Sequence, residues 1–225
     1  MSDLYGQYTV YKQWSGDAPA PVHEDYSYLV DIANCKPSDR ILEIGFGAGH
    51  FMDWARNNGF HVVGTEILPE MIAAARNRGH VVMDDMFSPT DQKFDVIIAI
   101  DVLEHIPQDG LRNMLERIRQ LLAPGGRLVA RFPNGDSPFN GRYQNGDATH
   151  LKPLSATSLA QVAIGTGMTV NRVMNPRPLP AATLPKLKRK FMYRVRDVIE
   201  TIIGRAYFGD RFPMDPNILV ILKPV

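Results

Sequence analysis

Short apolar runs alternate with amphipathic stretches along much of this chain, from Arg40 to about Pro133. Runs rich in valine, isoleucine and leucine predict strands, which we place at residues 40–45, 60–66, 81–84, 94–100 and 127–133. Apolar positions at helical spacing between these runs predict helices at about 49–58, 69–77, 102–106 and 110–122. This alternation indicates an α/β fold whose parallel sheet is covered by helices on both faces.

The segments that flank this pattern extend it into one domain, which we place at residues 39–225. The sequence predicts a polar loop at 134–150, a helix at about 155–165 capped by Ser155, a strand at 168–174, a Pro-rich turn at 176–185 and a last strand at 217–223. Residues 1–38 carry Tyr8, Tyr11 and Trp14 before a helical stretch near 22–34. We interpret them as an N-terminal cap that either folds over the site as a lid or packs at its rim.

An insertion before the last strand, residues 186–208, is predicted to form a basic amphipathic helix. Its apolar positions recur at helical spacing: Leu187, Phe191, Val195, Val198, Ile202 and Ala206. Lysines and arginines surround them, against only Asp197 and Glu200. Two interpretations stay open. Either the helix packs on the domain with a solvated charged face, or it meets an anionic membrane or an anionic substrate.

Composition places few further limits on the function. The length of 225 residues fits one domain with additions, and a net charge of +1 gives no reason to expect nucleic-acid binding. The single cysteine, Cys35, excludes an internal disulfide and is read as an inert, small core residue. We expect a cytoplasmic protein, because no signal peptide is visible and the apolar runs are too short to span a bilayer. The sequence carries no signal for an oligomeric state.

The first predicted strand runs directly into a glycine-rich turn, in the sequence RILEIGFGAG. Gly45, Gly47 and Gly49 let the chain turn tightly and let a ligand lie against the backbone. A dinucleotide-binding turn has glycine at its sixth position, which is His50 here. The Glu43 carboxylate disfavours a pyrophosphate at the following helix and favours a ligand that carries a cation, such as a sulfonium.

Further acidic residues stand at or near the ends of later strands. Glu66 ends the second strand, where a carboxylate can accept both ribose hydroxyls of an adenosine, unless it is simply solvated. Asp85 can accept a hydrogen bond from the adenine amino group while Met86 lines the ring. Asp84 is the second candidate for this contact. In the alternative interpretation, both aspartates only form a turn. Asp101 ends the fourth strand, at the edge where ligands of such sheets bind.

Together these motifs resemble those of the class I S-adenosylmethionine-dependent methyltransferases. The resemblance rests on ILEIGFGAG, the acidic Glu66, the step at Asp85, FDVIIAIDVLEHI and LLAPGGRLV. It implies a doubly wound, Rossmann-like seven-stranded sheet whose last strand, at 217–223, is antiparallel. It also implies S-adenosyl-L-methionine as the cofactor, with contacts at Glu43, Gly45, Phe46, Gly47, Gly49, Glu66, Ile67, Asp85, Met86 and Asp101.

Two histidines are placed to remove a proton from a methyl acceptor. His150 follows the fifth strand in a polar segment, and His105 lies in the short helix after the fourth strand. An imidazole titrates near neutral pH and suits a general base. In the alternatives, His150 pins its loop by hydrogen bonds and His105 is a packing residue. No histidine–carboxylate spacing indicates a metal site, so we expect none.

The segment from Pro133 to His150 is loosely similar to that of methyltransferases in bacterial surface-polysaccharide and glycolipid pathways. This resemblance implies a hydroxyl or phosphate-oxygen acceptor on a saccharide, a glycolipid or another small metabolite. Asn134, Arg142 and Tyr143 are then the candidate acceptor contacts. A lipid-linked acceptor gives the basic helix at 186–208 a purpose, because the helix could hold the protein at the inner face of the membrane.

Other functions are also compatible with a glycine turn. A nicotinamide-dependent oxidoreductase is disfavoured by Glu43 and His50. A protein that binds the cofactor without catalysis stays open, because binding motifs do not prove turnover. A nucleic-acid methyltransferase usually carries a motif such as Asn-Pro-Pro-Tyr after the fourth strand. The sequence there is Asp101-Val102-Leu103-Glu104, so we expect no nucleic-acid partner.

Overall fold

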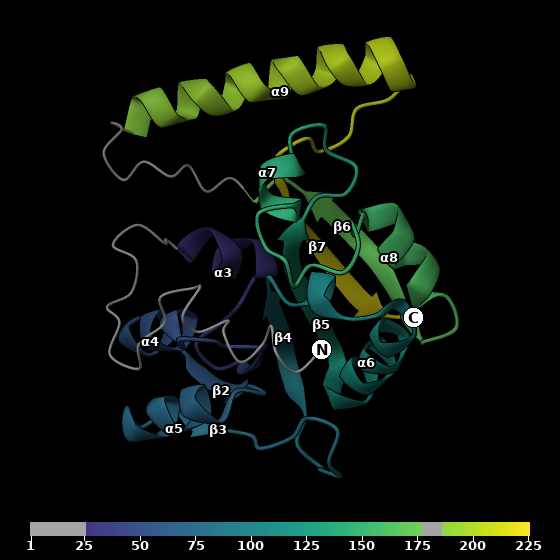
Figure 1. The fold of residues 1–225 in the computed structure, drawn as a ribbon. Coiled ribbons are helices and arrows are strands. Elements are labelled where there is room, and N and C mark those ends of the chain that lie inside the picture. Colours follow the sequence, from purple (N-terminus) through teal and green to yellow (C-terminus); the bar gives the residue numbers. More distant parts are fainter. Residues whose placement is uncertain (1–25, 177–185) are drawn as a thin grey trace.

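The computed structural model describes residues 26–176 and 186–225, and its centre is a seven-stranded sheet in the order β3-β2-β1-β4-β5-β7-β6 (Figure 1). The strands are β1 Arg40–Ile44, β2 His61–Thr65, β3 Val81–Val82, β4 Phe94–Ile100, β5 Leu122–Pro133, β6 Met168–Met174 and β7 Asn217–Pro224. Strands β1 to β5 pair in parallel, whereas β7 is antiparallel to both of its neighbours. The predicted doubly wound sheet with an antiparallel last strand is confirmed.

Helices cover both faces of this sheet. They are α3 Ser27–Ala33, α4 His50–Asn57, α5 Pro69–Asn77, the 3₁₀ turn η1 Leu103–His105, α6 Gln108–Leu121, α7 Gly141–Gln144, α8 Ala156–Ala163 and α9 Lys186–Phe208. Figure 1 shows α6 and α8 on one side of the sheet, α3 and α4 on the other, and α9 across one end. The chain therefore forms three layers, as strand–helix alternation requires.

The core follows the alternation of side chains along the strands. Ile41 points into the cluster formed with α3 and α4, whereas the next residue, Leu42, packs with α6 and α8. Both are fully buried, because side chains of a strand alternate between the two faces and helices cover both. A third cluster joins Phe46 of the glycine turn to Met52 of α4 and Met71 of α5.

Several boundaries differ from the sequence predictions. The helix expected at 102–106 is only the 3₁₀ turn Leu103–His105, because Pro107 follows at once and a second helix begins there. The strand expected at 81–84 is two residues long. The helix expected to end at residue 122 ends at Leu121, and β5 begins immediately. The register of β4 and β5 slips at this point, where Gly125 has a φ of 76°.

The N-terminal segment is described from Tyr26 onward. Tyr8, Tyr11 and Trp14, and most of the turn predicted at 176–185, lie outside the described residues, so the lid stays a prediction. Helix α3 packs through Leu29 and Val30 against the sheet. The described part of the predicted cap therefore contributes to the hydrophobic core of the domain. The boundary between cap and domain at residue 38 stays a prediction.

The acidic residues of helix α9 pair with the segment that directly follows the helix. Arg211 pairs with Asp197 at 2.7 Å and with Glu200 at 3.2 Å, and Glu200 is 4% exposed. Three of the apolar positions that one interpretation packs on the domain instead face outward, because Phe191 is 65%, Val198 57% and Ile202 62% exposed. Within the described parts of the chain, no helix combines the length and apolar character needed to cross a membrane.

Candidate functional site

The glycine turn lies at the carboxyl edge of the sheet, between β1 and α4. Strands β2 and β4 flank β1, so the ends of all three strands meet at this edge. Gly45 has a φ of 67°, and a Cβ built there would lie 2.7 Å from Cγ2 of Val102. Only glycine fits both the left-handed conformation and the close approach of the segment after β4. The Val102 side chain therefore packs directly against the backbone of Gly45.

A cleft of about 310 Å³ opens beside this turn. The described residues that line it include four with carboxylate side chains and one histidine, His105, but no lysine or arginine. Apolar side chains form most of the remaining wall, including Leu68, Phe87, Val102, Ile106 and Met114. A cleft of this charge favours a cationic ligand with an apolar body over a pyrophosphate.

Glu66 stands at the wall of the cleft, directly after β2. One carboxylate oxygen accepts a hydrogen bond from the Gly47 N–H at 2.8 Å. The other accepts from the N–H groups of Ile67, at 2.6 Å, and Leu68, at 3.2 Å. Glu66 therefore also satisfies the backbone at the start of α5. An ionised carboxylate has about four lone-pair sites and three are used here, so about one is left for a ribose hydroxyl. Ile67 also lines the cleft and is 75% exposed.

Asp85 and Met86 also line the cleft, after β3, which is the neighbour of β2 in the sheet. The Asp85 carboxylate accepts from the Phe87 N–H at 2.9 Å and from the Ser88 hydroxyl at 3.0 Å. These two hydrogen bonds, the Phe87 N–H first, lower the pKa of Asp85. Asp85 is thus a turn former and a cleft residue at once. Asp84, the predicted substitute, lines the cleft too and forms an ion pair with Arg76.

Asp101 follows β4 in a left-handed conformation, with a φ of 55°. Its carboxylate binds the guanidinium of Arg131 through two contacts, of 2.6 Å and 3.2 Å. Its backbone N–H also donates to the carbonyl of Arg131. Asp and Asn tolerate this backbone region better than other non-glycine residues. Such strain collects at binding sites, and Asp101 is one of the residues that line the cleft.

The other predicted cofactor residues shape the turn without lining the cleft. Glu43 is 4% exposed and Phe46 is 5% exposed. Phe46 is part of the core cluster with α4 and α5. Gly47 gives its N–H to Glu66, and Gly49 sits against the guanidinium of Arg78 as the N-cap of α4. Glu43 is buried and does not line the cleft, so its contact with a ligand stays a prediction.

The two candidate histidines lie together at one end of the cleft. Their rings are 4.8 Å apart, and His105 lines the cleft. His105 Nδ1 lies 3.0 Å from the Thr149 hydroxyl, and His150 Nδ1 lies 3.0 Å from the Gln144 carbonyl oxygen. His150 Nε2 lies 3.8 Å from Oε1 of Glu104. Sequence reasoning placed both histidines correctly at the functional edge but did not predict this pairing.

The predicted acceptor contacts divide into two groups. Asn134 is fully buried, and its side-chain amide donates to the carbonyls of Pro213 and Asp215. As an acceptor contact Asn134 is a wrong prediction, because its polar atoms join two loops of the protein. Arg142 and Tyr143 lie exposed on α7 and stay predictions as acceptor contacts.

Sequence reasoning missed two charged residues at this edge. Arg131 pairs with Asp101, and a cation inside the apolar β5 run was the signal for it. Glu104, next to His105, is 2% exposed and faces the histidine pair. No sequence pattern indicated a role for Thr149 and Asp147. Only the folded loop shows that the Thr149 hydroxyl contacts His105 Nδ1 and donates to Asp147.

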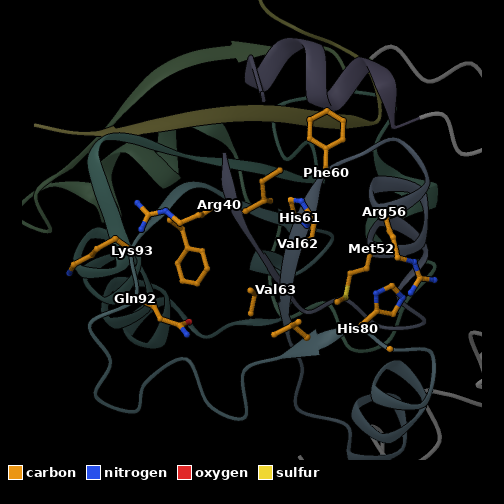
Figure 2. Close-up of a pocket in the computed structure, with 14 residues that line it drawn as sticks. Arg40, Met52, Arg56, Phe60, His61, Val62, Val63, His80, Gln92 and Lys93 are labelled. Atoms are coloured by element: carbon orange, nitrogen blue, oxygen red, sulfur yellow. The ribbon is translucent and has the colours of Figure 1, made fainter. Parts of the chain in front are cut away.

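A second hollow, of about 400 Å³, lies at the opposite, amino edge of the sheet (Figure 2). The first residues of the strands line it, among them Arg40, His61 and Phe94, together with Arg56 in the last turn of α4 and Phe60 beyond it. None of the acidic residues singled out in the sequence reaches this hollow. The cleft at the carboxyl edge is therefore the candidate cofactor site.

A family model for the methyltransferase domain matches residues 18–173. The chain belongs to this methyltransferase-domain family. Its cofactor is accordingly S-adenosylmethionine, as the resemblance of the sequence motifs implied. The acidic cleft of this methyltransferase-domain protein fits a sulfonium, and Gly45 forms part of the wall of that cleft.

Several proteins with similar sequences are named as methyltransferases. A ubiquinone biosynthesis O-methyltransferase of Nitrobacter winogradskyi is 32% identical over 109 residues, covering 45% of this chain and 41% of that protein. One of Aeromonas salmonicida is 29% identical over 188 residues, covering 74% and 77%. The chain spans less than half the length of the first relatives that it matches.

The fold of this methyltransferase-domain protein is also similar to that of solved enzymes. The CcbJ methyltransferase from Streptomyces caelestis superposes with a TM-score of 0.67 at 16% identity, covering 99% of this chain and 98% of the other. At this identity the similarity concerns the fold. It includes regions on both sides of the matched family segment.

Proposed function

We propose that this protein transfers a methyl group from S-adenosylmethionine to an oxygen atom of its acceptor. The observation that carries the proposal is the cleft beside Gly45, whose charged lining residues Glu66, Asp84, Asp85 and Asp101 are acidic. When bound, S-adenosylmethionine supplies a methyl group on a positively charged sulfur, and carboxylates nearby stabilise that charge. The names of the relatives support an oxygen acceptor.

Each lining residue has a proposed part in holding the cofactor. Glu66 accepts from the ribose hydroxyls, Asp85 accepts from the adenine amino group and Met86 contacts the adenine ring. Asp101 lies beside the methionine portion. The order of these residues around the cleft supports this arrangement, because Asp101 and His105 occupy the end away from Asp85 in the strand order.

The histidine pair belongs to the acceptor end in this proposal. The acceptor hydroxyl gives its proton to Nε2 of His150 or His105 while its oxygen forms a bond to the methyl carbon. The carbon–sulfur bond breaks, and its electron pair stays on sulfur. His150→Ala should slow turnover strongly and change the affinity for adenosylhomocysteine little, whereas His61→Ala at the far edge should change neither. An unchanged rate in His150→Ala rules out this histidine as the base.

The acceptor that we propose is a hydroxyl or phosphate oxygen of a saccharide, a glycolipid or another small metabolite. Support comes from the exposed Arg142 and Tyr143 on α7, which offer a cation and an aromatic ring. The experiment is a labelled-methyl transfer assay with cell extract, followed by mass spectrometry of the product. A labelled O-methyl product supports the proposal. Cofactor binding without any labelled product favours a binding protein, and hydride transfer from a nicotinamide favours the oxidoreductase.

A peripheral contact with an anionic membrane is also proposed, through the outward face of α9. Phe191, Val198 and Ile202 are each more than half exposed. Lys188, Arg194 and Arg205 are exposed beside them, whereas Asp197 and Glu200 are paired with Arg211 on the domain side. An exposed apolar stripe flanked by cations is what an interfacial helix presents to anionic lipid.

Vesicles with an anionic lipid test this contact at low salt. The protein should sediment with them, and Ile202→Ser should release it. Ile164→Ser is the matched control, because Ile164 is 71% exposed at the end of α8, away from α9. Failure of wild-type protein to sediment, or equal release by both variants, contradicts the membrane contact.

A further inference from the structure

We propose that Glu104, His105 and His150 form a binding site for one divalent transition-metal ion. One ligand atom from each of the three side chains lies within 4.8 Å of the other two. This grouping was not expected from the sequence, because His150 lies far along the chain from the other two. The backbone brings them together, since the Leu151 N–H donates to the Glu104 carbonyl at 3.1 Å.

Hydrogen bonds to the other ring nitrogen orient both histidines. His150 Nδ1 faces the Gln144 carbonyl, which can only accept, so the proton is on Nδ1. The Thr149 hydroxyl donates to Asp147, so it accepts from His105 Nδ1, as does the Thr149 carbonyl. In the neutral form of either ring, Nε2 therefore carries the lone pair. Metal-binding histidines are usually held in this way by a second hydrogen bond.

The third side chain supplies the negative charge. Glu104 is 2% exposed, and a buried carboxylate is stabilised by a nearby cation. His150 Nε2 and Glu104 Oε1 are 3.8 Å apart, which is beyond hydrogen-bond distance. Two ligands at about 2.0–2.2 Å from one ion lie roughly 3–3.5 Å apart. A contraction of well under an ångström in this pair therefore suffices.

The ligand types indicate which ion this site takes. Two imidazoles and one carboxylate suit zinc, manganese, iron, cobalt or nickel better than magnesium or calcium, which prefer oxygen ligands alone. Three protein ligands leave coordination positions open, as in catalytic metal sites. His105 lines the cofactor cleft, so these positions are reached from the cleft.

The consequence for catalysis rests on the proposed methyl transfer to oxygen. An acceptor hydroxyl bound to the ion loses its proton more readily, because the cation stabilises the oxygen anion. While the ion is bound, His105 and His150 use their Nε2 lone pairs as ligands and do not accept the proton. The proton then passes to solvent. The site itself does not depend on the proposed function, because metal binding is measured without an acceptor.

Calorimetric titration of the full chain, freed of metal by a chelator, tests the site with ZnCl₂ and MnCl₂. We expect saturable binding of one ion per chain. Glu104→Gln and His150→Gln should each weaken binding by at least roughly tenfold, since each removes a ligand. His61→Gln, at the amino edge of the sheet, is the matched control and should bind as wild type does.

Circular dichroism and adenosylhomocysteine binding show whether each variant is folded. At least one of the two ligand variants must be folded, and a folded variant with wild-type metal affinity overturns the site. Absence of saturable binding by the wild-type chain at millimolar metal overturns it as well, as does equal weakening in His61→Gln. Methyl transfer that fails while metal still binds contradicts the proposed function and leaves the metal site standing.

Discussion

The Glu66 carboxylate accepts a hydrogen bond from the Gly47 N–H at 2.8 Å. This contact joins the acidic residue after β2 to the glycine turn after β1, so that two segments of the cofactor cleft hold one another in place. The second carboxylate oxygen is held by Ile67 and Leu68. The orientation of Glu66 is thus fixed by the backbone before any ligand arrives.

Replacing Glu66 by glutamine should weaken the binding of adenosylhomocysteine by roughly 10- to 100-fold, because a charged acceptor of hydrogen bonds is lost. Isothermal titration calorimetry gives the affinity. Glu70→Gln is the matched control, because Glu70 is exposed on the first turn of α5. Near-normal affinity in Glu66→Gln would remove Glu66 from the ribose role.

Asp101→Asn should separate the charge of Asp101 from its backbone role. Asparagine tolerates the left-handed conformation, so the free energy of unfolding should change little, whereas Asp101→Ala should cost about 1 kcal/mol more. Both variants lose the charge that pairs with Arg131, and both should bind adenosylmethionine more weakly. Urea unfolding and calorimetry measure the two effects. Equal stability of the two variants contradicts backbone strain at residue 101. Unchanged affinity for adenosylmethionine contradicts a binding role for the Asp101 carboxylate.

The Cys35 thiol should react slowly in the folded protein. Burial is the main cause that raises its pKa to about 11, against the smaller lowering effect of Arg127. At pH 8 the thiolate fraction, and so the alkylation rate with iodoacetamide, should be roughly a hundredfold below that of the unfolded chain, whose thiol has a pKa of about 8.5. Comparing the rates with and without urea checks this, and equal rates contradict it.

Asp95 should contribute to stability at neutral pH and lose that contribution in acid. The Arg40 backbone N–H, at 2.9 Å, is the largest cause that lowers the pKa of Asp95, and the Arg40 guanidinium adds to it. A lowered folded pKa stabilises the protein above the unfolded pKa of about 4, and this contribution is lost as the pH falls through the folded value.

Asp95→Asn should therefore lower the free energy of unfolding by about 0.5–1 kcal/mol at pH 7, a modest value because the site is partly exposed. The difference from wild type should shrink as the pH falls below 4. Urea unfolding at several pH values measures it. A difference that stays constant or grows in acid contradicts the assigned cause.

The strands and most helices could be predicted because local patterns determine them. The runs around Ile41 and Ile97 are apolar on both faces, which is typical of buried parallel strands. Ser155 caps α8 as predicted, with Ser158 completing the reciprocal hydrogen bonds. Boundaries were less predictable where two signals compete, as at Pro107, which ends the 3₁₀ turn and precedes α6.

The site was predictable where a residue follows a strand and unpredictable where a loop folds back. Glu66 and Asp101 line the cleft because strand ends converge at one edge. Asn134 also follows a strand, but the segment that leads into β7, which includes Pro213, packs over it and buries it. The meeting of Glu104 with His150 depends on the path of a polar loop, which no periodicity encodes.

Calorimetric titration of the wild-type chain with adenosylhomocysteine, adenosylmethionine and, separately, NADH tests the central claim most directly. We expect saturable binding of one adenosylhomocysteine or adenosylmethionine per chain, and no binding of NADH, because the charged groups that line the cleft are carboxylates. Saturable binding of NADH, or no binding of adenosylhomocysteine and adenosylmethionine by the folded chain, would contradict the account.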